Sequence, residues 1–339
     1  MTQLYALGLG VGTQNSKGDW LEVYFPTPLL APSPKTVEAV IESIGDHNGA
    51  STIPIIPEQL NGLANGDSEL ADTAKTLLQS KQPLVVVMLA ANEGPQTVAE
   101  AYLKLQLLSH RLVKPHETKL DGIFGVLPNV AWTNKGAYDL DELPQAQLEA
   151  RMAGELLSVE SVDKFPKMTN YIMPKGVRIA DTSRVRLGAY LGEGTTVMHE
   201  GFVNFNAGTL GTSMVEGRIS AGVVIGVGSD LGGGCSTMGT LSGGGNMIIA
   251  VGEECLIGAN AGIGIPLGDR CTVEAGLYIT AGTKLALLDD KNEVIEHVKA
   301  RDLAGKNDLL FRRNSLSGAV ECKTNRSAIA LNNELHANN

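Results

Sequence analysis

A six-residue period in the second half of the chain restricts the possible folds more than any other feature. Small aliphatic residues recur at every sixth position and are often followed, three residues later, by glycine. A period of six fits neither a 3.6-residue helix nor a simple hairpin meander. It is typical of a parallel β-helix, in which three short strands and three tight turns make one triangular coil. The predicted inward-facing row is Ile179, Val185, Leu191, Val197, Val203, Ile219, Ile225, Leu231, Thr237, Gly243, Ile249, Cys255, Ala261, Leu267, Val273, Ile279 and Leu285.

The period breaks between Val203 and Ile219, whose spacing is not a multiple of six. The stretch between them holds one carboxylate, Glu216, among glycines, small polar residues and asparagines. We expect the extra residues to leave the coil as a loop that carries Glu216, because loops on a rigid solenoid often hold functional side chains. The segment 239–247 (GTLSGGGNM) covers two weak positions of the row and is expected to bulge as well.

The part of the chain before the repeat predicts a mixed α/β domain over residues 1–170. Strands are expected at 4–13, 20–26, 83–90 and 122–134, and helices at 33–45, 67–81, 96–113 and 139–159, the last with an early break at Pro144. Ser33 is a candidate N-cap with Pro34 at the first helical position. The GLGVG sequence near the N-terminus is not GxGxxG and does not open a helix, so a glycine-rich strand or turn is favoured over a nucleotide site. After the repeat (171–288), residues 289–339 are expected to form a small C-terminal β extension.

Composition excludes several classes of function. The formal net charge is −10 and no Lys/Arg-rich run occurs, which argues against a nucleic-acid partner. No apolar run approaches the roughly 20 residues that a membrane span requires, so we expect a soluble, cytoplasmic protein without a membrane partner. The four cysteines form no CxxC pair, and buried free thiols are favoured over a zinc site.

Four longer strings carry a family resemblance: DKFPKMTNYIMPKGVRIAD, RVRLGAYLGEGTTVMHEGFVNFNAGTLGTSMVEGRISAGVVIG, MGTLSGGG and LLFRRNSLSGAVE. With them the chain resembles the tetrahydrodipicolinate N-succinyltransferase family of the lysine and diaminopimelate pathway, over roughly residues 100–339. The resemblance implies that the β-helix is left-handed and that the chain forms a homotrimer with active sites between adjacent subunits. It also implies transfer of the succinyl group of succinyl-CoA to the nitrogen of tetrahydrodipicolinate, giving N-succinyl-2-amino-6-oxopimelate and CoA.

The same resemblance assigns roles to individual residues. Glu216 is the implied catalytic carboxylate, either as the base that takes a proton from the attacking amine or as a nucleophile that forms a mixed anhydride. The backbone N–H of Gly239 is the implied oxyanion donor. Glu200 is the implied ligand of a magnesium ion near the trimer axis, although a second acidic ligand of some relatives is replaced here by Ser183. The implied acyl-CoA contacts are Arg218, Gly233, Ser236, Ala259, Glu274, Ala275, Gly282, Lys299, Arg312, Arg313, Asn314 and Ser315.

Three other functions are compatible with a hexapeptide solenoid. A binding or structural β-helix would not need a carboxylate at an interruption of the repeat. A γ-type carbonic anhydrase would need three zinc histidines, whereas the repeat contains His199 alone. An acetyl-CoA-dependent transferase of the same fold differs only in the pocket around the acyl group, so the sequence leaves this alternative open.

Overall fold

The computed structural model describes residues 3–45, 49–239 and 247–324. The chain divides into two compact units, one formed by residues 1–113 and 117–166 and the other by residues 114–116 and 167–339. The division into three parts at residues 170 and 288 stays a prediction. Among the described residues, no helix is long and apolar enough to cross a membrane.

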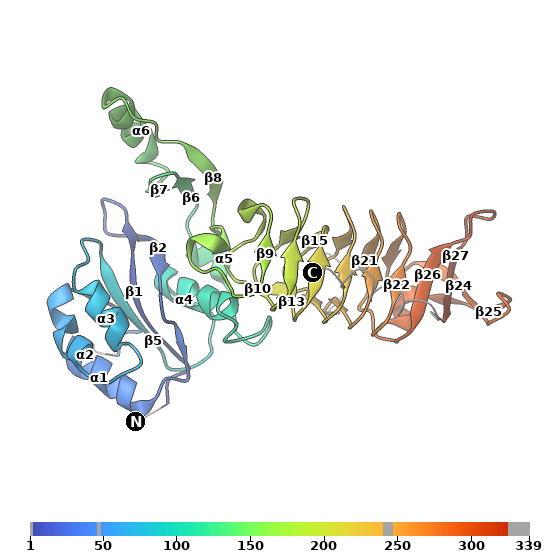
Figure 1. The fold of residues 1–339 in the computed structure, drawn as a ribbon, viewed down its shortest axis with the longest axis horizontal. Coiled ribbons are helices and arrows are strands. Elements are labelled where there is room, and N and C mark those ends of the chain that lie inside the picture. Colours follow the sequence, from blue (N-terminus) through green and yellow to red (C-terminus); the bar gives the residue numbers. More distant parts are fainter. Residues whose placement is uncertain (1–2, 46–48, 240–246, 325–339) are drawn as a thin grey trace. The chain divides into compact units, whose positions relative to one another are not determined.

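The first unit contains both helices and strands, but its strands pair antiparallel. Its main sheet has the order β2-β1-β5-β4, with β3 also on β1, and a second sheet has the order β7-β6-β8 (Figure 1). This is an α+β arrangement rather than the α/β arrangement that was expected. The elements are β1 (Ala6–Gln14), β2 (Trp20–Tyr24), β3 (Leu29–Leu30), α1 (Pro34–Ile44), β4 (Thr52–Ile55), η1 (Pro57–Leu60), α2 (Asn61–Asn65), α3 (Ala71–Leu77), β5 (Leu84–Leu89), α4 (Val98–Ser109), α5 (Ile123–Val126), β6 (Val130–Thr133), β7 (Gly136–Asp139), α6 (Leu143–Met152) and β8 (Val159–Asp163).

Two short sequence features of this unit, the Ser33 N-cap and the GLGVG segment, have a direct physical explanation in the structure. The Ser33 hydroxyl accepts the N–H of Thr36 at the start of α1, which confirms the predicted N-cap. The GLGVG sequence lies within β1, where a Cβ on Gly8 or Gly10 would lie only 2.6 or 2.8 Å from the Phe25 ring. These glycines therefore make room for an aromatic core residue and bind no nucleotide phosphate.

Two predictions in this unit were wrong. The start of the segment 122–134 is a helical turn, α5, and only its end is a strand, β6. Pro144 does not break a helix but lies in the first turn of α6, where proline is well tolerated because the first N–H groups of a helix have no intrahelical partner.

The second unit is a parallel β-helix, as the six-residue period predicts, built from three columns of short parallel strands (Figure 1). The hand of the coil stays a prediction. The first column is β10 (Ala189–Leu191), β13 (Ala207–Thr209), β16 (Val224–Ile225) and β19 (Ala250–Val251). The second is β9 (Arg178–Ile179), β11 (Thr195–Val197), β14 (Ser213–Val215), β17 (Asp230–Leu231), β20 (Leu256–Ile257) and β22 (Thr272–Val273). The third is β12 (Phe202–Val203), β15 (Arg218–Ile219), β18 (Ser236–Thr237), β21 (Gly262–Gly264) and β23 (Tyr278–Thr280).

The second column continues into the C-terminal strands, which include antiparallel pairs. There β22 pairs parallel with β26 (Leu309–Arg313), β26 pairs antiparallel with β27 (Val320–Thr324), and β24 (Lys284–Leu288) lies between β27 and β25 (Val294–Lys299). The short helices of this unit are η2 (Met168–Asn170), η3 (Thr182–Arg184) and η4 (Ala300–Leu303).

The described residues of the predicted inward row are buried, except for the half-buried Ile179, but part of the register was displaced by two residues. Ile249, Cys255 and Ala261 are buried, whereas the residues that pair with the rows of the adjacent coils are Val251, Ile257 and Ile263. Residues two apart on a strand point to the same side, so each hexapeptide has two inward positions. Periodicity alone does not distinguish them. Gly243 of the predicted row lies outside the described residues.

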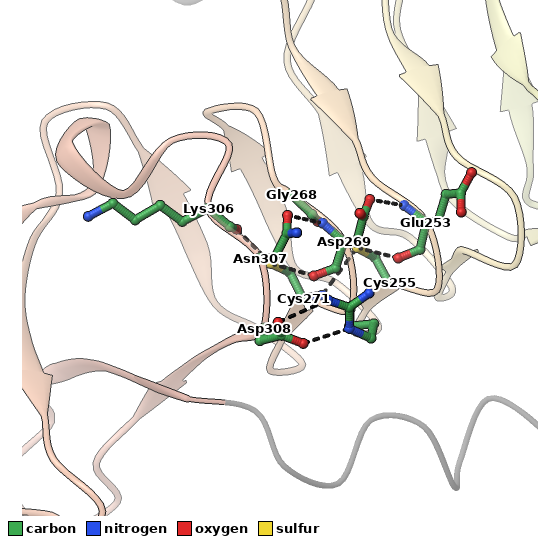
Figure 2. Close-up of polar contacts among 9 residues, drawn as sticks. Glu253, Cys255, Gly268, Asp269, Cys271, Lys306, Asn307 and Asp308 are labelled. Carbon is green, nitrogen blue, oxygen red and sulfur yellow. Dashed lines mark hydrogen bonds and ion pairs between the residues drawn. The ribbon is translucent and has the colours of Figure 1, made fainter.

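Glycine marks the corners of the coils because the next coil passes close by. A Cβ on Gly268 would overlap the side chain of Asn307, and one on Gly252 would lie 2.6 Å from Asp269 Oδ1. Asp269 Oδ1 accepts the N–H of Glu253 at 2.9 Å, and Asn307 Oδ1 accepts the N–H of Asp269 at 2.9 Å (Figure 2). These side chains satisfy corner N–H groups that the strands leave unpaired.

The cysteines support the same packing. All four are buried free thiols, as predicted. Cys255 and Cys271 stack in consecutive corners, where Cys271 N–H donates to Cys255 Sγ at 3.2 Å (Figure 2). Burial raises the pKa of Cys235 and of Cys322 to about 12, which disfavours a reactive thiolate at either residue.

Candidate active site

The irregular spacing before Ile219 is a shortened corner and not a loop. Val203 pairs with Ile219 and Val197 with Val215, so all residues between them belong to regular coils. The corner from Val197 to Val203 takes six residue steps, whereas the equivalent corner from Val215 to Ile219 takes four. The expected loop was therefore wrong: two residues are missing from the coil, and Glu216 lies on the tightened corner.

Hydrogen bonds to the next coil hold this corner in place. Glu216 N–H donates to the carbonyl of Leu231 at 2.8 Å, and the Glu216 carbonyl accepts the N–H of Gly234 at 3.2 Å. Gly217 is buried against Cys235, and a Cβ at Gly217 would overlap the Cys235 sulfur. The backbone that presents Glu216 is consequently fixed, while its side chain is only half-buried.

The Glu216 carboxylate faces a corner without side chains. The next coil turns through Gly232, Gly233 and Gly234, and a Cβ on Gly233 would lie 3.6 Å from Glu216 Oε2. Gly234 has φ +70°, a conformation that favours glycine. The three glycines therefore place no side chain beside the carboxylate.

Several of the predicted acyl-CoA contacts lie along this same corner, one coil after another. Asn260 N–H donates to the Gly233 carbonyl at 2.9 Å, Gly276 N–H donates to the Ala259 carbonyl at 2.8 Å, and Glu274 N–H donates to the Phe311 carbonyl at 2.9 Å. The structure thus aligns the following residues on one edge of the solenoid: Glu216, Gly233, Ala259, Glu274, Ala275, Arg312 and Arg313. Adjacent coils are about 4.8 Å apart, so this edge suits an elongated molecule.

The outward face of the third column contains polar and aromatic groups next to this edge. Arg218 and Ser236 are register partners, and Arg218 Nη2 donates to Ser236 Oγ at 2.6 Å. Further along, the Tyr278 ring covers Gly262, where any Cβ would overlap the ring. Tyr278 is 44% exposed. Tyr278 was not predicted, because it lies sixteen residues after its partner Gly262, whereas three hexapeptides give a coil of eighteen residues.

Two further arginines extend the positive charge on this face. The guanidinium groups of Arg184 and Arg186 lie 5.9 and 5.8 Å from the centre of the Phe202 ring, and Phe202 is the register partner of Arg218. Guanidinium groups bind carboxylates well because their N–H groups match both oxygens. Sequence reasoning missed both arginines, since only the coil pairing places RVR beside the Arg218 strand.

Within one chain, Gly239 lies far from Glu216. A Cβ on Gly239 would lie 3.3 Å from the Ala221 carbonyl, at the opposite end of β15 from Glu216. Glu216 and Ala221 lie on either side of β15, at the two ends of one side of the coil. One copy of the chain therefore places the carboxylate and the predicted oxyanion donor at different corners.

Gly282 and Lys299 also lie away from the Glu216 edge. Gly282 follows β23, and the nearby Lys299 pairs with Lys284 at the start of β24. A hollow of about 610 Å³ there is lined by Lys284, Glu296, His297, Val298, Lys299, Arg301 and Asp302. The lining combines three lysine or arginine side chains with two acidic ones, Glu296 and Asp302.

Glu200 lies on the corner between β11 and β12, where its carbonyl accepts Arg184 Nη2 at 3.0 Å. In the described part of the chain, no three His, Cys, Asp or Glu side chains converge as metal ligands would. A single chain thus contributes Glu200 alone to the predicted magnesium site.

Comparisons with known proteins agree with this geometry. Residues 127–167 match the family model described as tetrahydrodipicolinate N-succinyltransferase middle, and residues 248–281 match the hexapeptide repeat of succinyl-transferase. Proteins from Pseudomonas putida and Vibrio cholerae named 2,3,4,5-tetrahydropyridine-2,6-dicarboxylate N-succinyltransferase are 65% and 60% identical to the chain, each over 99% of both sequences.

A crystal structure from Campylobacter jejuni, described as a 2,3,4,5-tetrahydropyridine-2-carboxylate N-succinyltransferase, superposes with a TM-score of 0.88 at 34% identity. The match covers 97% of this chain and 94% of that one. With full-length identities of this size, the chain belongs to the tetrahydrodipicolinate N-succinyltransferase family of hexapeptide-repeat acyltransferases.

Proposed function

We propose that the protein transfers the succinyl group of succinyl-CoA to the nitrogen of tetrahydrodipicolinate and releases CoA and N-succinyl-2-amino-6-oxopimelate. The observation that carries the proposal is the tightened corner that presents Glu216 to an edge without side chains, in a chain of this family. The edge that continues through Ala259 and Ala275 to Arg312 suits an elongated thioester donor.

The chemistry of this site needs a group that accepts a proton. As the substrate nitrogen attacks the thioester carbonyl, it must lose a proton, and the Glu216 carboxylate can take it. In the other route the carboxylate attacks the thioester first, CoA thiolate leaves, and the nitrogen then attacks the resulting anhydride. In both routes the C–S bond breaks and the N–C bond forms. Water that adds across the C=N bond of the substrate ring supplies the N–H and the oxygen that becomes the 6-oxo group of the product. The proton of the nitrogen goes to Glu216 or, in the anhydride route, to the released CoA thiolate, and Glu216 ends as a free carboxyl group.

The arginines on the outward face of the third column suit an acceptor with two carboxylates. Arg184, Arg186 and Arg218 lie on or beside consecutive strands of the third column, and Arg218 follows Glu216 by two residues. Paired N–H donors of guanidinium groups recognise a carboxylate by both oxygens. This pattern favours a dicarboxylate substrate over a simple amine.

A second copy of the chain completes the site in this proposal. The distance between Glu216 and Gly239 in one chain supports an arrangement in which Gly239 N–H comes from a neighbouring subunit, as in a homotrimer. The magnesium site near a threefold axis has weaker support, because one chain supplies Glu200 and no further ligands in its described part. No step of the proposed reaction depends on a metal.

The alternative function is acetyl transfer by the same fold, and one experiment separates the two. The purified protein is incubated with tetrahydrodipicolinate and either succinyl-CoA or acetyl-CoA, and the release of free thiol is followed. We expect thiol release with succinyl-CoA that depends on the acceptor and is much slower with acetyl-CoA. Equal or faster release with acetyl-CoA would identify an acetyltransferase, and no release with either donor would contradict the proposed reaction.

A further inference from the structure

The last hairpin of the second unit presents the RRNS run in a stiff turn. Strands β26 and β27 pair antiparallel, with Arg312 opposite Glu321. Between the strands, the Asn314 side-chain oxygen accepts the N–H groups of Leu316 and Ser317, both at 3.0 Å. Arg313 Nη1 donates to the Gly318 carbonyl at 3.1 Å. The turn is therefore held by its own side chains.

The Glu321 carboxylate contacts two residues of this run, Arg312 and Asn314. Only 7% of Glu321 is exposed, and its carboxylate accepts two hydrogen bonds and makes an ion pair with Arg312. Arg312 Nε and Nη2 both lie 2.9 Å from Oε2, and Asn314 Nδ2 lies 2.8 Å from Oε1. A buried carboxylate requires such partners, because desolvation without them is costly. In return it fixes the orientation of both donors.

We propose that Glu321 is a positioning residue for acyl-CoA, acting through Arg312 and Asn314. The inference rests on the proposed function and on the acyl-CoA contacts implied for the RRNS run, whose arginines would bind the anionic nucleotide end of the donor. A guanidinium has five N–H groups, and the contact to Glu321 uses only Nε and one N–H of Nη2. The Nη1 edge of a half-buried Arg312, oriented by Glu321, provides donors to a phosphate without the entropy cost of ordering a free side chain.

The chain offers a matched control pair. Arg270 and Asp308 make the same kind of contact, Nε to Oδ1 at 2.6 Å and Nη2 to Oδ2 at 2.9 Å, but both side chains are more exposed than Glu321 and neither belongs to the predicted donor contacts. Asp308→Asn removes a carboxylate from an arginine pair of similar geometry at another corner. Any general effect of breaking such a pair should appear in this variant as well.

The test compares two donors at saturating tetrahydrodipicolinate, succinyl-CoA and succinyl-pantetheine, which lacks the nucleotide. For Glu321→Gln we expect the KM of succinyl-CoA to rise about tenfold while kcat stays within about twofold, because loss of a charge-assisted contact weakens binding without touching the reacting atoms. The KM of succinyl-pantetheine should not change. Glu321→Asp should restore part of the loss, and Asp308→Asn should match the wild type with both donors.

Coupling to Arg312 separates positioning from a general structural role. In the Arg312→Ala background, Glu321→Gln should raise the KM of succinyl-CoA much less than in the wild type, because the interaction with Arg312 is already lost and only the contact to Asn314 remains. Fully additive effects, or equal KM increases for the two donors, would overturn the inference. If Arg312→Ala alone leaves the KM of succinyl-CoA unchanged, the assignment of the RRNS run to the donor fails, and the inference fails with it. If Arg312→Ala raises this KM and Glu321→Gln does not, only the inference is wrong.

Discussion

At the scale of single residues, Glu216 has the combination of properties that acyl transfer requires. Its backbone is hydrogen-bonded to Leu231 and Gly234, so the position of the main chain that carries the carboxylate is fixed. Its side chain is half-buried and faces Gly233, which leaves the space beside it open. A fixed backbone and a free side-chain end let one carboxylate reach a thioester and still exchange a proton with the acceptor.

Glu216→Gln tests this residue directly. Glutamine keeps the shape of the side chain but does not accept a proton at neutral pH, and positioned proton transfer contributes about 10²–10⁴-fold to a rate. We expect turnover to fall by at least about 100-fold, with succinyl-CoA affinity and oligomeric state retained. Steady-state kinetics and calorimetric donor titration measure the two effects.

Incubation with labelled succinyl-CoA alone distinguishes the two routes. The anhydride route predicts a hydroxylamine-sensitive label at Glu216 in the wild type and none in the variant, whereas the general-base route predicts no label in either. A variant that turns over at a rate close to wild type would show that Glu216 has only a structural role.

At the scale of elements, the corner between β14 and β15 takes four residue steps where most corners of the described coils take six. The corner from Ile263 to Leu267 is shortened in the same way, but only the first carries Glu216. Removing two residues from a corner forces the chain to turn through Gly217, directly against the Cys235 corner of the next coil. The coil remains in register, since Ile219 still pairs with Val203. The corner therefore changes the path of a few residues without disturbing the core.

Gly217→Ala should damage this corner specifically. The added Cβ would overlap Cys235 Sγ and lie 2.7 Å from the Cys235 carbonyl oxygen, so the backbone must shift. Overpacking of this kind costs about 1–3 kcal/mol in stability, and we expect a larger relative loss in kcat because Glu216 moves with the corner. Thermal unfolding and steady-state kinetics provide the two measurements.

The matched control for this change is Gly125→Ala, because a Cβ at Gly125 meets nothing within 4 Å. This variant should retain wild-type kinetics and lose no stability. If Gly217→Ala also keeps wild-type kcat, the tight corner is not required to place the carboxylate.

At the scale of the whole molecule, the proposed function assigns two incomplete halves of a site to the described residues of one chain. Glu216 and Gly239 lie at opposite ends of the coil side that contains β15. Closed cyclic symmetry would bring unlike surfaces of neighbouring copies together and repeat the contact at every interface. A homotrimer with three equal sites is the simplest assembly of this kind.

Mixing two inactive variants tests the shared site. Glu216→Gln removes the carboxylate, and Gly239→Pro removes the N–H donor. If the two groups come from different chains, random trimers from an equal mixture regain about a quarter of the wild-type sites, because one interface in four combines two intact halves. Sedimentation checks that the species is a trimer. An absence of recovered activity after verified subunit exchange, or an active monomer, would contradict the intersubunit site.

Sequence and tertiary structure each determined a different part of this protein. The six-residue period predicted the β-helix because one short strand and one turn repeat at that length, and the N-cap at Ser33 followed from local hydrogen bonding. Neither of these two predictions required the family resemblance. The same period, however, did not distinguish an insertion from a deletion, so Glu216 was placed on a loop when it lies on a shortened corner.

Only the tertiary structure decided which residues become neighbours across coils. Arg186 beside Phe202, Tyr278 over Gly262 and Glu321 beneath Arg312 depend on which strand lies above which. A coil of sixteen residues and one of eighteen place different side chains in contact, and coil length changes along the chain. Local sequence determines each strand and turn, but the cumulative register of the solenoid determines the site.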